Sequence, residues 1–381
     1  MLDFAIVGGG PVGLFCAVAL RRVGRSVTLL ERDAARHDET RSIGVHSASL
    51  ACLERLDLLG SFVARGVVIE RAVLVGSRGV LGTLDLRLAS ARHGFALSIP
   101  QPRTEALLER AAGERGVTIL RGATVVGFEQ RRDRVELDYE REGQRQSLSA
   151  RHLIGCDGAS SRTRAALGIA ACRHRLPGSY LMAEFPRTPG LDDDAWFFLA
   201  DPGLVESFPL PDGQQRWVVE APGRRDRVDL VELCEQVARR TGHELDPAAG
   251  TQASAFGAPQ ALARRFCRGR VLLLGDAAHV LSPFGAQGMN LGWLDGFALA
   301  ELAARRWTRV GLEPEVLEQW SRSRRRAGVA GLLQATAITL VGRKSSVPRV
   351  RNAFVRGAMV GPLATVLSRS FGMQPLAPRA R

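Results

Sequence analysis

The first third of the chain alternates short apolar runs with a longer apolar stretch of helical period. Residues 4–7 and 27–30 have the length and apolarity of buried strands, and residues 14–20 between them suit a helix. Further along, the pattern predicts a helix from Thr104 and strands at 73–75, 81–86, 117–120 and 134–139. Strand, helix and strand in this order predict a parallel, Rossmann-like sheet.

The middle of the chain has a different pattern. Residues 172–260 are rich in aromatic side chains and turn signals, and we expect a mostly antiparallel sheet there, joined by residues 71–98. The predicted fold class is therefore α/β (α+β). We expect a discontinuous Rossmann-like domain (1–70, 99–171 and 261–330), an inserted sheet domain (71–98 and 172–260) and C-terminal helices (331–381).

A glycine-rich turn follows the first predicted strand. It has the pattern G-x-G-x-x-G and comprises Gly8, Gly10, Pro11, Val12 and Gly13. The first glycine permits a tight turn, the second lets the backbone approach a pyrophosphate, and the third allows close packing of helix on strand. Glu31, at the end of the next strand, is placed to receive ribose hydroxyls. Nicotinamide and flavin dinucleotides share this unit, so the turn does not choose between them.

Residues 271–300 distinguish between a nicotinamide and a flavin dinucleotide. An apolar strand at 271–274 ends at Gly275-Asp276, a loop with His279 and Pro283 follows, and a helix begins through 285–290. A carboxylate and the free N–H groups of a helix start can hold a polar, electron-rich ligand. The segment resembles the second flavin motif of the FAD-dependent aromatic hydroxylases, the p-hydroxybenzoate hydroxylase family. It matches every position of the pattern G-D-A-A-H, a gap, and P-x-G-A/G-Q-G-x-N.

The resemblance implies roles for these residues. In the family the aspartate, here Asp276, hydrogen-bonds the ribityl chain, and the proline and glycine loop packs against the isoalloxazine ring. A D-G-x-x-S-x-x-R element at Asp157 to Arg164 supports the pyrophosphate region, although a helix-capping role for it stays open. The cofactor-binding residues implied are Gly8, Gly10, Pro11, Val12, Gly13, Glu31, Arg32, Arg41, Gln101, Val126, Asp157, Gly275, Asp276, Pro283, Gly285, Ala286, Gln287, Gly288, Met289 and Asn290.

The family resemblance also implies a reaction. Its members bind FAD and take electrons from NADPH or NADH, which fits the absence of a second glycine fingerprint. Reduced flavin then captures molecular oxygen as the C4a-hydroperoxide, which hydroxylates an electron-rich phenolic or quinoid ring. Pro283 and Gly285 beside the flavin, and His46, are the catalytic candidates, with a purely structural His46 as the alternative. A flavin-dependent reductase or epoxidase acting on an isoprenoid or polyketide is the alternative enzyme.

We expect the aromatic sheet to cover the substrate site. Because side chains alternate between the two faces of a strand, about half of them are expected to be core residues instead. The substrate candidates are Tyr180, Met182, Trp196, Phe198, Ser207 and Trp217. Because Tyr139 and Tyr180 are the only tyrosines, the tyrosine pair that deprotonates the phenol in p-hydroxybenzoate hydroxylase is not expected. A halogenase would need a catalytic lysine, and the only lysine is Lys344, far down the tail.

Composition agrees with a large folded enzyme. The chain has 381 residues with 45% hydrophobic content, enough for a sizeable core. Its six cysteines lack metal-ligand spacing, so we expect no metal site and a reduced, cytoplasmic protein, either monomer or homodimer. The first strand starts at once, so we expect no signal peptide.

The net charge of +13 is concentrated in the C-terminal tail. Residues 319–381 contain twelve cations and no Asp or Glu, interrupted by apolar helical stretches at 329–341 and 353–367. No nucleic-acid module accompanies the charge, so nucleic acid is not an expected partner. Packing on the flavin domain and peripheral contact with an anionic membrane both stay open. The tail, with its Arg351-Asn352 pair, also resembles that of the ubiquinone-biosynthesis hydroxylases, which act on lipid-tailed phenols.

Overall fold

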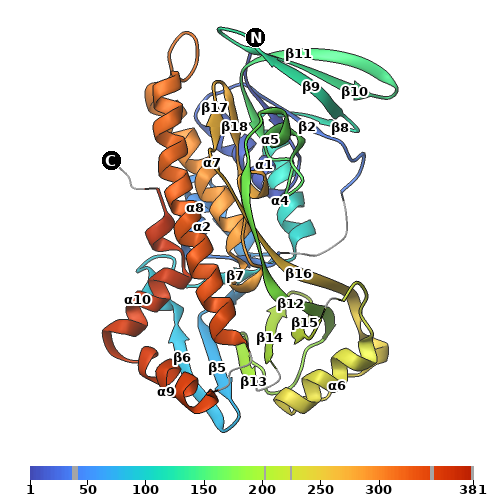
Figure 1. Cartoon of the computed structure of the whole chain (residues 1–381), viewed down its shortest axis with the longest axis vertical. Coiled ribbons are helices and arrows are strands. Elements are labelled where there is room, and N and C mark those ends of the chain that lie inside the picture. The colour runs from blue at the N-terminus through green and yellow to red at the C-terminus, as the bar shows by residue number, and fades with distance from the viewer. Residues whose placement is uncertain (37–41, 201–202, 224, 344–346, 379–381) are drawn as a thin grey trace.

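The computed structural model describes residues 1–36, 42–200, 203–223, 225–343 and 347–378. Two eight-stranded sheets form the body of the molecule, one above the other in Figure 1. Two long strands, β12 (Ala171–Pro186) and β16 (Thr251–Ala263), run down from the upper half into the lower sheet. This mixed architecture confirms the predicted fold class.

The upper sheet is mainly parallel, in the order β17-β18-β11-β1-β2-β8. Its parallel strands are β1 (Leu2–Val7), β2 (Val27–Glu31), β8 (Thr118–Arg121), β11 (Gln144–Gly155) and β18 (Val271–Leu273). From β1 the chain adds β2 and β8 on one side and then returns to add β11 and β18 on the other. Doubly wound sheets bind ligands at the carboxyl ends of their strands at such a switch point.

Antiparallel strands extend this sheet. The edge strand β17 (Cys267–Arg268) pairs with β18, and β9 (Thr124–Gln130) with β10 (Val135–Arg141) and β11 forms the ribbon at the top of Figure 1. The short helix α5 (Arg162–Ala166) follows β11. Its first turn is capped by Ser161, whose hydroxyl accepts a hydrogen bond from the Arg164 N–H at 2.9 Å, as the sequence suggested.

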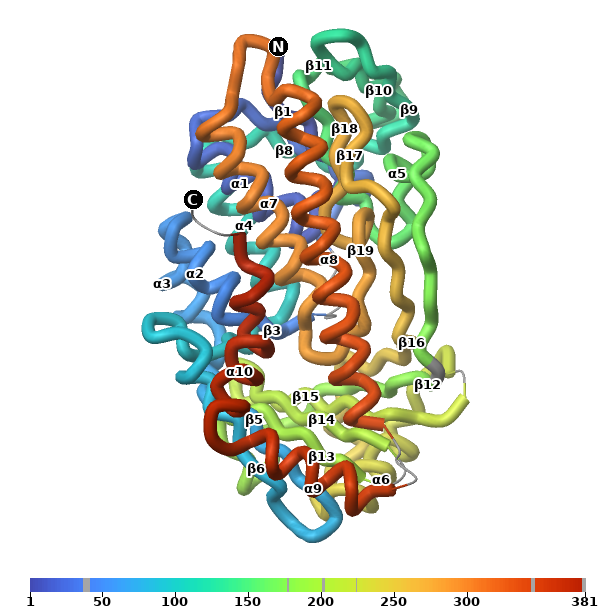
Figure 2. The backbone as a smooth tube through the Cα atoms, turned by 60° about the vertical axis from the view of Figure 1, so that its left-hand side comes forward, coloured from blue at the N-terminus to red at the C-terminus, as the bar shows by residue number. Residues whose placement is uncertain are grey.

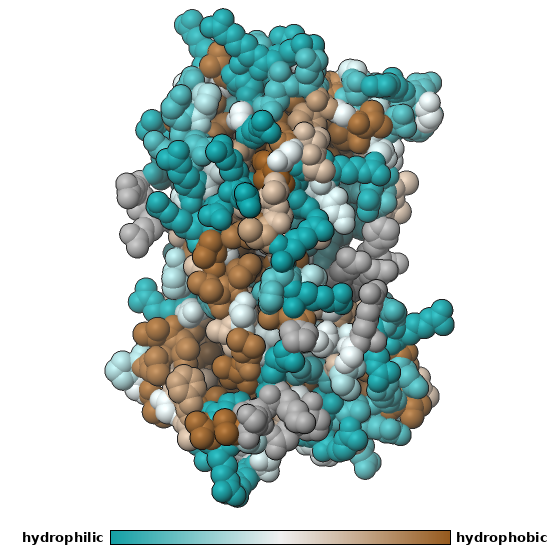
Figure 3. Space-filling model, viewed as in Figure 1, coloured by the Kyte–Doolittle hydropathy of each residue, from teal (hydrophilic) through white to brown (hydrophobic). Residues whose placement is uncertain are grey.

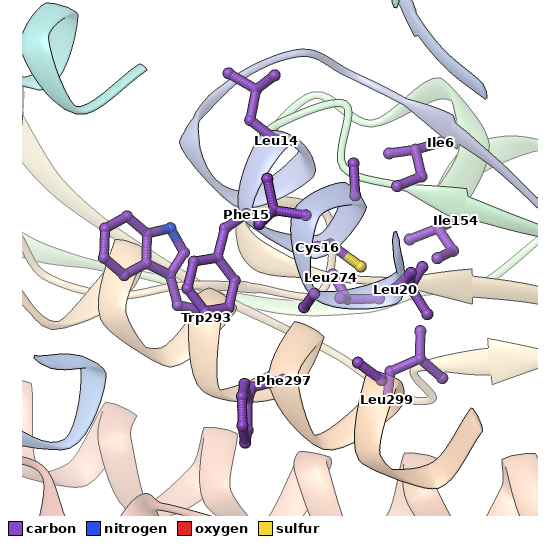
Figure 4. Close-up of a cluster of buried hydrophobic side chains, with 14 of the residues drawn as sticks. Ile6, Leu14, Phe15, Cys16, Leu20, Ile154, Leu274, Trp293, Phe297 and Leu299 are labelled. Atoms are coloured by element: carbon purple, nitrogen blue, oxygen red, sulfur yellow. The ribbon is translucent and has the colours of Figure 1, made fainter. Parts of the chain in front are cut away.

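Helices α1 (Pro11–Arg22) and α7 (Gln287–Arg306) pack closely, and their buried side chains form the cluster of Figure 4. A Cβ atom on Gly292 would lie 2.6 Å from Val12 Cγ2, so glycine is required for this approach. The Phe15 and Trp293 rings stack with centroids 4.8 Å apart. Each large apolar side chain buried in this way contributes about 1.5–3 kcal/mol. The cluster therefore fixes the starts of two helices that carry the two glycine motifs.

Helix α4 (Gln101–Glu114) packs on α1. It begins at Gln101 rather than at the predicted Thr104, because Pro102 lies in the first turn, where a helix needs no N–H donor.

The lower sheet runs β19-β16-β12-β15-β14-β13-β5-β6 and is antiparallel except between β13 and β5. Its remaining strands are β5 (Arg71–Gly76), β6 (Gly79–Asp85), β13 (Ala195–Ala200), β14 (Gly203–Leu210), β15 (Gln214–Ala221) and β19 (His279–Val280). Helix α6 (Leu230–Thr241) covers one face, and short 3-10 turns at Leu86–Ala89 and Pro247–Ala249 follow β6 and precede β16.

A small sheet and two short helices lie between the large sheets. The strands are β3 (Gly44–Val45), β7 (Ala96–Ser98) and β4 (Val67–Ile69), and the helices are α2 (Ser47–Arg55) and α3 (Leu59–Val63). These strands are too short to show an alternating pattern, which is why the sequence did not predict them.

The C-terminal helices are α8 (Pro314–Gly342), α9 (Pro348–Ala358) and α10 (Gly361–Phe371), followed by a 3-10 turn at Gln374–Leu376. Both views show α8 running alongside the upper and lower halves (Figures 1 and 2). The predicted helical stretch 353–367 is divided, because Gly361 has a φ of +62° and Pro362 follows it. Among the described residues, no helix is long and apolar enough to cross a membrane.

Candidate functional site

A cavity of about 870 Å³ lies at the switch point of the upper sheet. It opens between the carboxyl ends of β1 and β11, where Val7, Gly8, Cys156 and Asp157 line it. Six residues predicted to bind the cofactor line this cavity together, namely Gly8, Gly10, Glu31, Arg32, Val126 and Asp157. We call it the nucleotide cavity.

The glycines of the first motif are required by close backbone contacts. Gly8 has a φ of +108°, and a Cβ atom there would lie 2.3 Å from the Cys156 carbonyl oxygen. A Cβ atom on Gly13 would lie 2.0 Å from the Gly8 carbonyl oxygen. Gly10 differs, because a Cβ atom there would meet nothing within 4 Å and would point into open space at the cavity wall. Protein packing therefore does not require a glycine at position 10. This is what we expect of a glycine that lets a ligand approach the backbone.

Two carboxylates hold the loops of the nucleotide cavity. Glu31 accepts hydrogen bonds from the Gly9 N–H at 2.5 Å and the Asp33 N–H at 2.9 Å. Asp157 accepts from the Ser161 hydroxyl at 2.5 Å and the Thr163 N–H at 2.9 Å. The capping role considered for Asp157 is thus present, and both carboxylates also line the cavity.

The Asp157 segment is tied to the second flavin motif. The buried Arg164 guanidinium donates to the Ala277 carbonyl at 2.8 Å and to the Ala159 carbonyl at 2.9 Å. Ala277 ends the 3-10 turn Gly275–Ala277 after β18, which holds the predicted Gly275 and Asp276. Asp276 is exposed and Gly275 is buried. Arg164 therefore links two elements that are far apart in the sequence.

A second cavity, of about 230 Å³, lies between the second motif and the lower sheet. Its wall includes the 3-10 turn Phe284–Ala286 and the start of α7, with the predicted Pro283, Gly285, Ala286, Gln287, Gly288 and Met289. Gly285 and Ala286 have positive φ angles of 74° and 50°, which turn the chain sharply into α7. Because its remaining walls are mostly apolar side chains, we call this the apolar cavity.

Asn290 and His46 fix the shape of this turn. The Asn290 side chain accepts from the His46 N–H at 2.9 Å and donates to the Gly44 and Ala286 carbonyls at 2.8 and 2.7 Å. The His46 Nε2 atom lies 2.5 Å from the Gly285 carbonyl oxygen and must carry the proton, since a carbonyl oxygen can only accept. Burial lowers the pKa of His46 to about 4. His46 is therefore neutral near pH 7 and holds Gly285 in place.

The residues of both cavities suit a dinucleotide with a polar ring system. Both amide atoms of Gln287 are buried at the wall of the apolar cavity and have no hydrogen-bond partner, an arrangement that a bound polar ring would satisfy. The N–H groups of the first turn of α7 are not used within the helix and favour an electron-rich group. A flavin dinucleotide would thus be held by the glycine turn, Glu31 and Asp157 at one end and by the start of α7 at the other.

Other predicted cofactor residues lie around these cavities. Pro11, Val12 and Gly13 form the first turn of α1. Gln101, at the start of α4, accepts from the Ser42 N–H at 3.2 Å and donates to Glu105 at 2.8 Å, so it supports the loop that carries Ser42 into the apolar cavity. Arg41 lies outside the described residues.

The lower sheet places four of the six substrate candidates away from the apolar cavity. Trp196, Phe198, Ser207 and Trp217 lie on the sheet face that is covered by α6, away from the apolar cavity. Ser207 pairs with Trp196 and Trp217 across the strands, and its hydroxyl accepts a hydrogen bond from Gln215 at 2.7 Å. Phe198, Ser207 and Trp217 are buried there and Trp196 is half-buried, because successive side chains of a strand point to opposite faces. Met182 lines the cavity, and Tyr180 packs on the same face against Phe284 and Phe256.

The sequence interpretation missed most of the cavity lining on the lower sheet. The residues that flank these four candidates along their strands line it instead, namely Phe197, Glu206, Phe208, Arg216 and Val218, and Phe256 of β16 lines it as well. The C-terminal Phe371 and the short strands β4 and β7 complete the wall. The sequence contained one signal for Glu206, which is the only acidic residue in the apolar strand 203–210. Burying a charged group costs free energy, so a buried acidic residue is expected to have a partner or a function.

Fold and cavities together define an FAD-binding protein with a separate apolar cavity beside the second flavin motif. Residues 1–334 match the family described as FAD binding domain. The chain belongs to this family, and its resemblance to the FAD-dependent aromatic hydroxylases is confirmed.

Named relatives are longer than this chain. Rifampicin monooxygenase from Streptomyces venezuelae is 35% identical over 324 residues, which cover 82% of this chain and 66% of the relative. Anhydrotetracycline monooxygenase from Streptomyces rimosus is 33% identical over 360 residues, covering 88% and 68%. The chain thus spans about two thirds of the length of these relatives. The crystal structure of p-nitrophenol 4-monooxygenase from Pseudomonas putida superposes with a TM-score of 0.88 at 24% identity, covering 100% of this chain and 99% of that one, and supports the fold.

Proposed function

We propose that this protein is an FAD-dependent monooxygenase that uses NADPH or NADH and molecular oxygen to hydroxylate an electron-rich aromatic ring. The overall reaction consumes one oxygen molecule, one reduced nicotinamide and one proton. It gives the hydroxylated ring, oxidised nicotinamide and one water. The named relatives are monooxygenases, which supports this class of reaction.

One observation carries the proposal. The turn that begins α7 and the apolar face of the lower sheet enclose a single cavity, so the flavin motif has room for a ring beside it. A bound FAD would supply the electrons and the site of oxygen activation. The side chains of Met182, Phe197 and Val218 would keep water away from the ring. The N–H groups at the start of α7 would stabilise negative charge there.

The cavity wall and the relatives support a proposal for the substrate class. We infer a phenolic or quinoid ring carried on a larger apolar skeleton, either a polyketide or a lipid-tailed phenol, because the wall is mostly aromatic and aliphatic. The reacting ring would lie between Pro283 and the sheet, with Gly285 held by His46.

The test is oxygen-dependent turnover by the purified protein loaded with FAD. A panel of phenols with short and long alkyl chains should stimulate NADPH or NADH oxidation, and ¹⁸O₂ should add one labelled oxygen to the ring. Gly10→Ala, in which the added Cβ atom meets no protein atom within 4 Å, should bind FAD more weakly and turn over more slowly at the same FAD concentration. Failure to bind FAD, or oxygen uptake that no phenol or quinone stimulates, contradicts the proposal.

We further propose that the C-terminal helices contact an anionic lipid surface. Exposed apolar side chains gather on α9, α10 and their flanks, at the lower left of Figure 3, namely Val347, Val350, Phe354, Val360, Leu363 and Val366. No acidic residue follows Glu318, and Arg349, Arg356 and Arg369 lie on the same helices, so the charge complements anionic headgroups.

Co-sedimentation with vesicles tests this contact. Binding should require phosphatidylserine and fall with Phe354→Ser, whereas Val231→Ser on the distant helix α6 should leave it unchanged. Equal binding to pure phosphatidylcholine, or a dimer that masks the surface in solution, contradicts it.

A further inference from the structure

A row of side chains crosses the lower sheet on the face that lines the apolar cavity. Strand register places Met182 of β12 opposite Val218 of β15, Val218 opposite Glu206 of β14, and Glu206 opposite Phe197 of β13. All four residues line the cavity. Glu206 is the only ionisable residue in this row and projects from the middle of an apolar wall.

Glu206 differs from the two other buried carboxyl groups on this sheet face. Glu184 accepts a hydrogen bond from Arg216, and Glu220 accepts from the Leu204 N–H at 3.2 Å and lies 3.5 Å from Arg343. Glu206 is 5% exposed, yet its Oε1 atom is buried and has no hydrogen-bond partner. Leaving a buried oxygen unsatisfied costs about 1–3 kcal/mol, so a partner is expected to arrive with the ligand.

The charges around Glu206 do not provide that partner. On the neighbouring strand β15, Arg216 donates to Glu184 of β12, and Glu220 is held by the Leu204 N–H and Arg343. Across the cavity, His46 is neutral near pH 7 because burial lowers its pKa to about 4. Burial also raises the pKa of Glu206 to about 8, so its carboxyl group carries a proton near pH 7. A protonated carboxyl can donate one hydrogen bond and accept another.

We propose that Glu206 determines which substrates the apolar cavity accepts, by donating a hydrogen bond to a carbonyl or hydroxyl oxygen of an uncharged aromatic molecule and by disfavouring aromatic carboxylates. This inference rests on the proposed function for the identity of the cavity as the substrate site. A negatively charged ring substituent placed against Glu206 would lose its hydration in the apolar cavity. Arg216 in the cavity wall would not compensate for this loss, because it is already bonded to Glu184. A ketone, quinone or hydroxyl oxygen would instead satisfy the protonated carboxyl.

Two probes of nearly equal shape test this selection in the FAD-loaded protein. 4-Methoxyacetophenone carries a carbonyl and does not titrate, whereas 4-methoxybenzoate carries a carboxylate. Binding is followed by the change in the flavin absorption spectrum from about pH 6 to about pH 9.5. The ketone should bind well below about pH 8 and about tenfold more weakly above it, because Glu206 loses the proton that it donates. The benzoate should bind at least about tenfold more weakly than the ketone at pH 7.

Three variants separate this role from a structural one. Glu206→Gln keeps the shape and a donor but cannot titrate, so ketone binding should become independent of pH. Glu206→Leu removes the donor and should weaken ketone binding about fivefold to tenfold at pH 7. Glu220→Gln is the matched control, because this carboxyl already has partners outside the cavity lining, and its pH profile should match the wild type.

The inference and the proposed function fail in different ways. If the protein binds FAD and oxidises nicotinamide with phenols, but ketone binding is unchanged by pH and by Glu206→Leu, only the role of Glu206 is overturned. Tighter binding of the benzoate than of the ketone overturns it as well. A protein that takes up no FAD overturns the proposed function itself.

Discussion

The nucleotide cavity and the apolar cavity are built in different ways. The nucleotide cavity is lined by four short segments, within 7–10, 30–33, 123–128 and 156–166, and the backbone around Gly8 leaves no room there for a Cβ atom. The apolar cavity is lined by the segment 281–289, by the short segments 42–44 and 96–98, and by scattered side chains of the lower sheet and the C-terminal helices. Backbone geometry imposes a fixed residue pattern, whereas a side-chain wall accepts many sequences of suitable volume.

This contrast predicts that the two glycines of the first motif respond differently to one methyl group. Gly13→Ala places a carbon 2.0 Å from a backbone oxygen, so we expect a loss of about 3 kcal/mol or more in unfolding free energy, together with loss of FAD. Gly10→Ala should change the stability of the apoprotein by less than about 0.5 kcal/mol but weaken FAD binding by about tenfold or more.

Urea unfolding of the apoproteins and the ratio of FAD to protein measure these two effects. Gly113→Ala, on the exposed side of α4, is the control and should be neutral or slightly stabilising. Equal destabilisation by Gly10→Ala and Gly13→Ala would show that Gly10 is kept for packing, against our interpretation.

A second prediction compares adjacent phenylalanines on opposite faces of β13. Phe198→Ala opens a hole against α6 and should cost about 3–5 kcal/mol in unfolding free energy without altering ligand affinity. Phe197→Ala enlarges a cavity that already exists, so it should cost less stability and change the affinity for aromatic ligands. Denaturant unfolding and flavin-detected ligand titration check the pair. The reverse pattern would mean that the ligand binds on the α6 side.

The third and smallest effect concerns His46 at the junction of flavin loop and cavity. Its pKa is about 4 in the folded protein and near 6.5 when exposed, so the unfolded chain takes up a proton first as the pH falls. Stability is therefore present above about pH 6.5 and is lost toward pH 4, by up to about 3 kcal/mol from this group. His46→Gln keeps a donor for Gly285 and should remove this part of the acid sensitivity, with little change at pH 7.

Urea unfolding at several pH values measures the His46 effect. Burial also lowers the pKa of His152, to about 3, so His152→Gln is a useful comparison that should remove a separate part of the acid sensitivity. The pH profile of turnover distinguishes a support for Gly285 from a catalytic role. If an inflection near pH 6.5 disappeared from this profile in His46→Gln but not in His152→Gln, His46 would be a titrating catalytic group.

Much of the fold could be predicted from the sequence. The predicted strands at 4–7 and 27–30 lie within β1 and β2, and the predicted helix at 14–20 lies within α1. The flavin family followed from the 275–290 segment alone. The small β3-β7-β4 sheet and the break at Gly361 were missed, since two- and three-residue strands carry no period and one glycine in an apolar run resembles a tolerated helix residue.

The amino-acid sequence by itself determined the glycine turns and the segment at 275–290, because contacts between neighbouring backbone segments leave few residue choices there. It also determined which residues of each strand in the lower sheet share a face: Trp196 with Phe198, and Phe197 apart from both. Only the tertiary structure decided which of those faces meets the cavity. The alternation of a strand has two equivalent phases, and the packing of α6 on one face and of the α7 turn on the other selects between them. That selection places Glu206, rather than Trp217, in the wall of the apolar cavity.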